Sequence, residues 1–330
     1  MTAEVQTLNI EAQLGALNQR IDDYDFGQEP NELYEPIRYI LSLGGKRLRP
    51  LLALLSYSIY KDTIEEALEP SIAIEVFHNF TLMHDDIMDE APLRRGQVTV
   101  HEKWNSNIAI LSGDAMLIKS YDLMLSSPAS ALKKVLARFN QTALEVCEGQ
   151  QYDMNFESRD EVSEEEYINM IRLKTAVLLG FALELGALVA GASESDTKAL
   201  YDFGVAAGIG FQLKDDLLDV YGEQQKVGKQ VGGDIISNKK TFLLISALNL
   251  ATPVQRKELD YWLGLKEFDK AEKVAAVTRI YDEIGVKALT EKLMGEYFDS
   301  GFHHLDNLGG RANQKAALVE FSKSLIARER

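Results

Sequence analysis

The chain has 330 residues, of which 46% are hydrophobic, 26% are charged and only 7 are proline, a composition that excludes a disordered protein. Its 35 Lys and Arg residues against 51 Asp and Glu residues give a formal net charge of −16, which argues against nucleic-acid binding over the whole surface. The one cysteine, Cys147, excludes an intrachain disulfide and a zinc site built from several cysteines. We therefore expect a cytoplasmic protein that binds no nucleic acid.

Prolines and glycines mark the ends of the predicted helices, because proline lacks a backbone N–H and glycine tolerates turn conformations. Between residues 129 and 252 there is no proline, apolar residues recur at helical spacing, and no convincing strand pattern is present. We expect ten or more helices, with Pro36, Pro50, Pro70 and Pro92 near helix ends and Gly44-Gly45, Gly96 and Gly232-Gly233 in connections.

The sequence predicts one all-α domain over residues 1–330. The acidic stretch Glu157–Glu166 starts a helix at Ser163-x-x-Glu166, which has the spacing of a capping box. The most apolar stretch, Thr175–Ala192, carries Glu184 and three glycines, so it favours a buried helix over stable membrane insertion. No linker, low-complexity segment or repeat divides the chain.

Two aspartate clusters share the pattern Asp-Asp-x-x-Asp, and each follows an apolar helical run. One is Asp85-Asp86-x-x-Asp89 and the other is Asp215-Asp216-x-x-Asp219. At this spacing three carboxylates lie within about one turn, where like charges repel and meet the unfavourable end of the helix dipole. One such cluster alone is typical of a solvated acidic helix end, whereas two with the same spacing indicate bound cations.

Carboxylates without Cys or His partners favour a hard ion, and Mg²⁺ completes its shell with water and substrate phosphates. The basic groups Lys46-Arg47-x-Arg49 and Arg94-Arg95 fit a diphosphate beside the metal, because guanidinium groups bind phosphate oxygens. A surface salt-bridge network is the alternative interpretation. His78 lies about two helical turns before Asp85 and alone would be typical of a core residue.

These motifs make the sequence resemble the trans-isoprenyl diphosphate synthases, or polyprenyl synthetases, from about Pro30 to beyond Lys240. Gly44-Gly45-Lys46-Arg47-Leu48-Arg49-Pro50 is similar to the family's isopentenyl diphosphate loop. Leu82–Asp89 with Arg94-Arg95-Gly96 resembles the first aspartate-rich motif, and Gly210–Asp219 resembles the second.

The resemblance implies the type I isoprenoid synthase fold, a helical bundle around a central cavity, and a homodimer. Two or three Mg²⁺ ions would bridge the allylic diphosphate between the two aspartate clusters. The metal ligands would be Asp85, Asp86, Asp89, Asp215 and Asp219, with Asp216 in a catalytic support role. The residues at the reacting centre would be Lys174, Thr175 and Gln212. The allylic diphosphate would be bound by Arg94, Lys174, Lys229 and Lys239. Isopentenyl diphosphate would be bound by Lys46, Arg49, His78 and Arg95.

The reaction implied by the resemblance is ionisation, condensation and elimination. Mg²⁺ and the basic groups stabilise the departing diphosphate, so that the allylic C–O bond ionises to a carbocation. Isopentenyl diphosphate attacks the cation, and the proton is then lost to the released pyrophosphate. Water must be excluded from the cation, which an apolar cavity achieves.

The product length is expected to depend on residues just before the first cluster. Phe80 is the fifth residue before Asp85, with Thr81 fourth and Phe77 eighth. The large residue at the fifth position, the small one at the fourth and the absence of an insertion in the motif resemble the archaeal type of geranylgeranyl diphosphate synthase, which makes a C20 product. The alternatives are a C15 or a longer C30–C40 product, with Phe80 only packing against a neighbouring helix.

Three other protein classes share part of this pattern. A class I terpene cyclase has a different second motif from Asp215-Asp216-x-x-Asp219. A non-catalytic subunit of a heteromeric prenyl synthase tends to lose one aspartate cluster, and this chain has both. A metal-buffering helical protein would not explain the basic residues.

Overall fold

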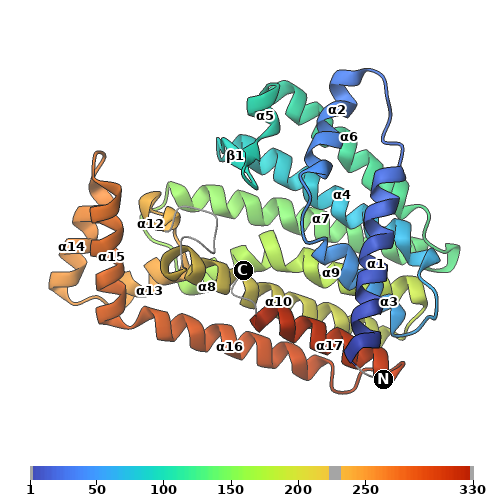
Figure 1. The fold of residues 1–330 in the computed structure, drawn as a ribbon. Helices are drawn as coiled ribbons and strands as arrows, with labels where there is room; N and C mark the ends of the chain where they lie inside the picture. Colours follow the sequence, from blue (N-terminus) through green and yellow to red (C-terminus); the bar gives the residue numbers. More distant parts are fainter. Residues whose placement is uncertain (1–2, 223–231, 328–330) are drawn as a thin grey trace. The chain divides into compact units, whose positions relative to one another are not determined.

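The computed structural model describes residues 3–222 and 232–327, and Figure 1 shows its helices. The all-α prediction and the expectation of ten or more helices are confirmed. The helices are α1 (Ala3–Asp23), α2 (Asn31–Ser42), α3 (Leu48–Ser58), α4 (Glu65–Met88), α5 (Val100–Lys103), α6 (Ser106–Met124), α7 (Ala129–Glu157), α8 (Glu164–Ile171), α9 (Val177–Ala190), α10 (Glu194–Tyr221), α12 (Gly233–Ile236), α13 (Phe242–Leu250), α14 (Pro253–Gly264), α15 (Lys270–Ile284), α16 (Val286–His304) and α17 (Ala312–Ala327), with the π-helix η1 (Arg172–Ala176) between α8 and α9.

The chain divides into two compact units, each made of separate segments. Unit 1 comprises Met1–Asn140, Phe181–Tyr201 and Leu308–Glu320, and unit 2 comprises Gln141–Gly180, Asp202–Asn307 and Phe321–Arg330. Four boundaries fall inside the helices α7, α9, α10 and α17, and the one between Asn307 and Leu308 falls in the connection between α16 and α17. The single-domain interpretation stays a prediction.

Unit 1 is built around α4, which packs against α3 and α6. Its core is aromatic: Phe77 of α4 contacts Phe139 edge-to-face at 5.1 Å between ring centroids, and Phe139 lies 5.9 Å from Phe181. All three rings are fully buried. Aromatic contacts of this kind add to the apolar area that α4 buries, so they fix the helix that ends in the first aspartate cluster.

One two-stranded hairpin interrupts the helices in the described part of the chain, and the sequence did not predict it. Strands β1 (Leu93–Arg94) and β2 (Gln97–Val98) pair antiparallel, with Arg94 opposite Gln97. The turn residues Arg95 and Gly96 both have positive φ, of 54° and 75°. A two-residue turn with two positive φ angles is the type I′ geometry that closes tight hairpins. Two-residue strands are too short to show alternation.

Among the described residues of unit 2, two apolar clusters can be traced. One joins α10, α13 and α15 through residues such as Leu217, Leu243 and Ile280, and the other joins α8, α10 and α13 through residues such as Met170, Leu213 and Ile245. The predicted capping box at Ser163 is confirmed: Ser163 accepts from the Glu166 amide, and Glu166 accepts from the Ser163 amide. Helix α8 therefore starts where the sequence indicated.

The prolines are only partly where they were expected. Pro50 is the third residue of α3, where a missing N–H has no cost because the first turn has no intrahelical acceptor. Pro36 and Pro70 instead lie inside α2 and α4, each five residues after the first helical residue. Each removes one intrahelical hydrogen bond, and both are buried, so packing offsets that loss.

The apolar stretch Thr175–Ala192, which the sequence placed in the protein core, lies up to Ala190 in a continuous helix over Glu164–Ala190. By length and composition it could cross a membrane, with a mean hydropathy of 1.8 in its most apolar window, but 83% of that window is buried inside the structure, as in the core helix of a soluble protein. Glu184 is 7% exposed and accepts two hydrogen bonds of 2.9 Å from Arg138 Nε. The expectation of a buried helix is confirmed.

The buried ion pair between Arg47 and Glu75 predicts a large stability effect. Arg47 Nη1 lies 2.8 Å from Glu75 Oε1, with side chains 6% and 3% exposed. Because Arg47→Met leaves an uncompensated buried charge, we expect it to lower the free energy of unfolding by about 3 kcal/mol. Urea denaturation measures this, with Arg256→Met, which breaks an exposed pair with Asp260, expected to change it by less than about 1 kcal/mol. Equal effects of the two substitutions would contradict the assignment.

Candidate active site

The first aspartate cluster lies where α4 ends, as predicted. Asp85 and Asp86 are in the last turn, and Asp89 is the C-cap residue. Asp86 is 3% exposed and is held by Arg94, whose Nε donates at 2.9 and 2.8 Å and whose Nη2 donates at 2.7 Å. Asp85 is half-buried and Asp89 is exposed. The second carboxylate is therefore neutralised within the protein, while the first and third are accessible.

The hairpin after α4 places two arginines against different partners. Arg94 is on β1 and pairs with Asp86, whereas Arg95 is in the turn and donates through Nη1 to the Gly44 carbonyl. A side chain at Gly45 would meet the Arg95 guanidinium, with its Cβ 3.0 Å from Nη1 and Nη2. The double glycine therefore lets the loop backbone approach Arg95. Tyr39 supports the hairpin by donating to the Val98 carbonyl at 2.7 Å.

Basic residues surround His78 in unit 1. Arg49 Nη1 lies 3.1 Å from His78 Nε2. Burial holds the pKa of His78 well below its usual value, and the positive charges of Arg49, Arg95, Arg94 and Arg47 lower it further. His78 is therefore neutral, so Nε2 accepts the hydrogen bond from Arg49. Four of the predicted binding residues thus lie close together, while Lys46 is an exposed residue just before α3.

The second aspartate cluster lies in the last two turns of α10, also as predicted. Asp216 is 3% exposed, accepts from the Tyr167 hydroxyl and accepts from Gln212 Nε2 at 3.1 Å. The pKa of Asp216 is raised to about 7, mainly by burial. The nearby Asp234 also raises this pKa, while the two hydrogen bonds and Lys239 oppose the increase. Asp215 is exposed and Asp219 is half-buried. The burial pattern repeats that of the first cluster.

Gln212 joins the cluster to the predicted reacting centre. Its Oε1 accepts from Thr175 Oγ1 at 3.3 Å while its amide nitrogen donates to Asp216. These two contacts fix the amide orientation, with oxygen toward the hydroxyl and nitrogen toward the carboxyl group. Sequence reasoning placed Thr175 and Gln212 together, and the structure does so.

Lys174 and Thr175 lie in the π-helix η1, a conformation that often marks functional sites. Lys174 Nζ donates to Asp153 of α7 at 2.5 Å. Two glycines contact η1: a Cβ at Gly149 would lie 2.2 Å from Lys174 N, and a Cβ at Gly208 would lie 2.6 Å from Ala176 Cα. Since backbone atoms cannot move aside as a side chain can, both positions require glycine at this packing.

The loop after the second cluster carries Lys239. The Asp234 amide donates to Asp219 Oδ2 at 2.9 Å, and the Lys239 amide donates to the Asp234 carbonyl at 2.9 Å. Lys239 is near enough to Asp216 to lower the pKa of that carboxyl group. The predicted binding residue Lys229 lies outside the described residues.

The residues expected to control product length lie one turn apart on α4. Phe77 is 1% exposed and belongs to the core, while Phe80 is half-buried and its ring centroid is 5.6 Å from Phe77 and 4.8 Å from His84. Thr81 donates to the His78 carbonyl at 2.8 Å. Their roles in chain length stay predictions.

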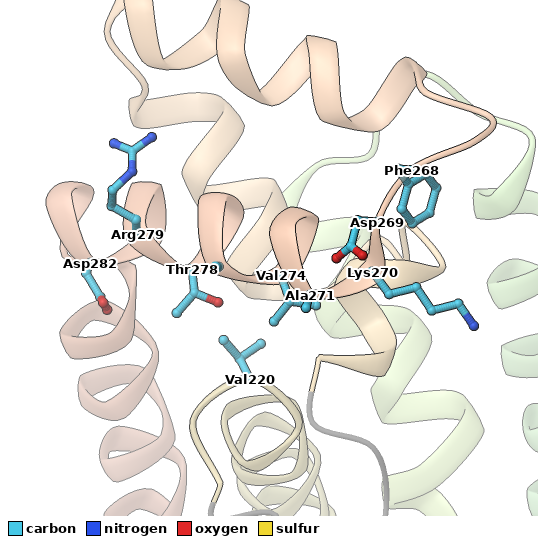
Figure 2. A pocket seen from close by; sticks show the side chains of 10 residues that line it. Val220, Phe268, Asp269, Lys270, Ala271, Val274, Thr278, Arg279 and Asp282 are labelled. Atoms are coloured by element: carbon cyan, nitrogen blue, oxygen red, sulfur yellow. The ribbon is translucent and has the colours of Figure 1, made fainter.

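A groove of about 970 Å³ lies along α15 near the end of α10 (Figure 2). Apolar side chains such as Val220 and Val274 line it, with charged Lys270, Arg279 and Asp282 around them. Among the described residues that line it, none is a predicted site residue.

Sequence reasoning missed Tyr167 and Asp153. Tyr167 lies 49 residues from Asp216, and Asp153 lies 21 residues from Lys174. No local spacing connects either pair, because each contact joins different helices. A buried carboxylate needs hydrogen-bond donors, and this need alone could have suggested that a donor such as Tyr167 exists.

Comparisons with known proteins agree with this site. The sequence model of the polyprenyl synthetase family matches residues 30–281. A geranylgeranyl pyrophosphate synthase of Geoglobus acetivorans is 36% identical over 315 residues, covering 95% of this chain and 96% of that protein. A crystal structure of a geranylgeranyl pyrophosphate synthase is 41% identical, covers both chains completely and has a TM-score of 0.89. The geranylgeranyl pyrophosphate synthetase of Pyrococcus horikoshii is 30% identical, with 98% and 99% coverage and a TM-score of 0.91.

An all-α chain with two aspartate-rich helix ends and clustered arginines defines a prenyl-transferring enzyme of the type I isoprenoid synthase fold. The chain belongs to the polyprenyl synthetase family.

The close approach of α7 to η1 predicts that Gly149→Ala is destabilising. The added methyl group would overlap the Lys174 backbone and displace either helix, so we expect a loss of about 1–3 kcal/mol in the free energy of unfolding. Gly295→Ala is the matched control: nothing lies within 4 Å of that Cβ, and alanine in α16 should stabilise by about 0.5–1 kcal/mol. Chemical denaturation compares them, and a Gly149→Ala protein as stable as the control would refute the tight packing.

Proposed function

We propose that this protein is a Mg²⁺-dependent trans-prenyltransferase that condenses isopentenyl diphosphate with dimethylallyl, geranyl or farnesyl diphosphate and makes C20 geranylgeranyl diphosphate. The observation that carries the proposal is the repeated burial pattern of the two clusters. In each, the second aspartate is 3% exposed and hydrogen-bonded, while the first and third are accessible to a ligand. The similarity to geranylgeranyl diphosphate synthases supports the C20 product.

The donor set fits Mg²⁺. Asp85, Asp89, Asp215 and Asp219 offer carboxylate oxygens, which a hard cation prefers, and two or three ions would share them with the allylic diphosphate. Asp86 would contribute through oxygen lone pairs that Arg94 does not use, and Asp216 would support the cluster from the interior. Bound Mg²⁺ would stabilise the negative charge of the departing diphosphate.

The basic residues divide between the two diphosphates. Isopentenyl diphosphate would be bound by Arg49, Arg95, neutral His78 and Lys46. Each guanidinium group can donate two parallel hydrogen bonds to phosphate oxygens. Arg94, Lys174, Lys229 and Lys239 would bind the allylic diphosphate. Lys174 is held by Asp153 until the substrate provides a stronger anion. In that arrangement Thr175 and Gln212 direct a hydroxyl and an amide toward the reacting carbon atoms.

We further propose a homodimer, with the outer face of α6 as a subunit interface. Ile110, Leu111, Ile118 and Leu125 are 42%, 59%, 63% and 55% exposed on or next to this helix. Exposed apolar residues gathered on one helix are unusual on a monomer and are typical of a surface that another chain covers. The buried apolar helix and the lone exposed cysteine fit a cytoplasmic enzyme.

The test is turnover of the purified protein with Mg²⁺, isopentenyl diphosphate and each allylic starter in turn, with product lengths read by mass spectrometry. A dominant C20 product is expected. C15 or C30–C40 products would keep the chemistry and overturn the length assignment. No product from any starter would refute the enzyme and favour a non-catalytic subunit.

Asp85→Asn and Asp215→Asn each remove one accessible ligand, so we expect turnover to fall about 100-fold or more. Circular dichroism should show unchanged helicity, because neither side chain is buried. Asp260→Asn is the control, since that exposed carboxylate pairs only locally with Arg256 in an i,i+4 contact on α14. Near-normal turnover of either cluster variant would refute its role as a metal ligand.

Phe80→Ala should lengthen the product, because it removes a large half-buried ring one turn before the first cluster. The product distribution with farnesyl diphosphate is the measurement. Phe139→Leu serves as a comparison within the aromatic core and should affect stability more than length. An unchanged distribution in Phe80→Ala would mean that Phe80 only packs against its neighbours.

A further inference from the structure

Helix α15 contains a lysine that is completely buried. Lys273 is 0% exposed, and burial lowers the pKa of its ammonium group. Its Nζ donates to Asn238 Oδ1 at 2.6 Å and to the Ile236 carbonyl at 3.3 Å, and it lies 4.2 Å from the centre of the Phe268 ring. Since an isolated buried ammonium is strongly unfavourable, these acceptors and the ring face compensate its charge.

Both acceptors lie just before Lys239: Ile236 is the last residue of α12, and Asn238 is in the loop that follows. Asn238 has a φ of 56°, in the left-handed region that is unfavourable for most residues with a Cβ and that asparagine adopts more readily. Its Nδ2 donates to the Leu263 carbonyl at 3.0 Å, so its side-chain amide is held on both sides. Lys239 is the next residue, so the backbone conformation of Asn238 determines the direction of the Lys239 side chain.

The same loop is connected to the second aspartate cluster. The Lys239 amide donates to the Asp234 carbonyl, and the Asp234 amide donates to Asp219 Oδ2, both at 2.9 Å. Lys273 therefore contacts this segment at Ile236 and Asn238, while Asp219 contacts it at Asp234. A shift at Asn238 would change the position of Lys239 relative to the cluster.

We propose that Lys273 is a positioning residue that holds Asn238 in its left-handed conformation and thereby directs Lys239 toward the allylic diphosphate. The inference rests on the proposed function, because it uses the binding role of Lys239. Lys273 acts only through the loop: its ammonium group is buried and has no access to substrate.

Lys273→Met tests this with a side chain of similar length that cannot donate. Losing hydrogen bonds from a charged donor should raise the KM for the allylic diphosphate about tenfold. The KM for isopentenyl diphosphate should stay within about twofold, because its proposed ligands are all in unit 1. Lys270→Met is the matched control on the same helix, since Lys270 is exposed along the groove in Figure 2 and should change neither constant.

Combining the substitution with Lys239→Ala separates positioning from a general loss of structure. If Lys273 acts through Lys239, Lys239→Ala with Lys273→Met should have the same allylic KM as Lys239→Ala alone. A further increase in the double variant, or equal increases in both KM values for Lys273→Met, would overturn the inference.

If Lys273→Met does not fold, Asn238→Gly tests the proposed role of Lys273 instead. Glycine adopts positive φ without a Cβ but lacks both side-chain contacts, so the allylic KM should again rise selectively. An unchanged allylic KM in a folded Asn238→Gly protein would refute the proposal. If the wild-type protein turns over no substrate, the proposed function itself fails, whereas active wild type with an unaffected variant refutes only the role of Lys273.

Discussion

Repulsion between adjacent carboxylates is the constraint on which the site depends. Each cluster places two aspartates side by side, and both cannot remain charged and exposed near a helix end without a compensating partner. The protein turns the second aspartate inward and gives it donors from another element: Arg94 of the hairpin for Asp86, and Tyr167 of α8 for Asp216. The remaining carboxylates then project from a helix end that packing has already fixed.

Two different donors solve the same problem with different electrostatics. Arg94 carries a full charge, so Asp86 is held as an ion pair with a charged partner. Asp216 accepts from the neutral donors Tyr167 and Gln212, and burial raises its pKa to about 7. The proposed ligands of isopentenyl diphosphate, Lys46, Arg49, His78 and Arg95, are all in unit 1. Those of the allylic diphosphate include Arg94 of unit 1 as well as Lys174 and Lys239 of unit 2.

Much of the helical architecture could be predicted from the sequence because its signals are local. The capping box at Ser163, the helix ends at the two clusters and the buried helix around Glu184 each depend on residues a few positions apart. The hairpin escaped prediction because two-residue strands have no period, and its type I′ turn uses Arg95 where Asn or Gly is usual. The family resemblance supplied the candidate site residues, but Tyr167, Asp153 and Lys273 could not be found. Their partners are distant in sequence, and a buried lysine has no distinguishing pattern before the structure shows its burial.

The π-helix has an evolutionary consequence. A π-turn contains one residue more than the α-helical turn it replaces, and each residue in a helix rotates the chain by about 100°. Deleting a single codon within Arg172–Ala176 would restore a regular helix and turn Lys174 or Thr175 away from Asp153 and Gln212, while the capping box at Ser163 would remain. With Lys174 and Thr175 in the roles proposed above, loss of one codon here would abolish catalysis in a descendant that still folds, and so produce a non-catalytic subunit from an active synthase in one genetic step.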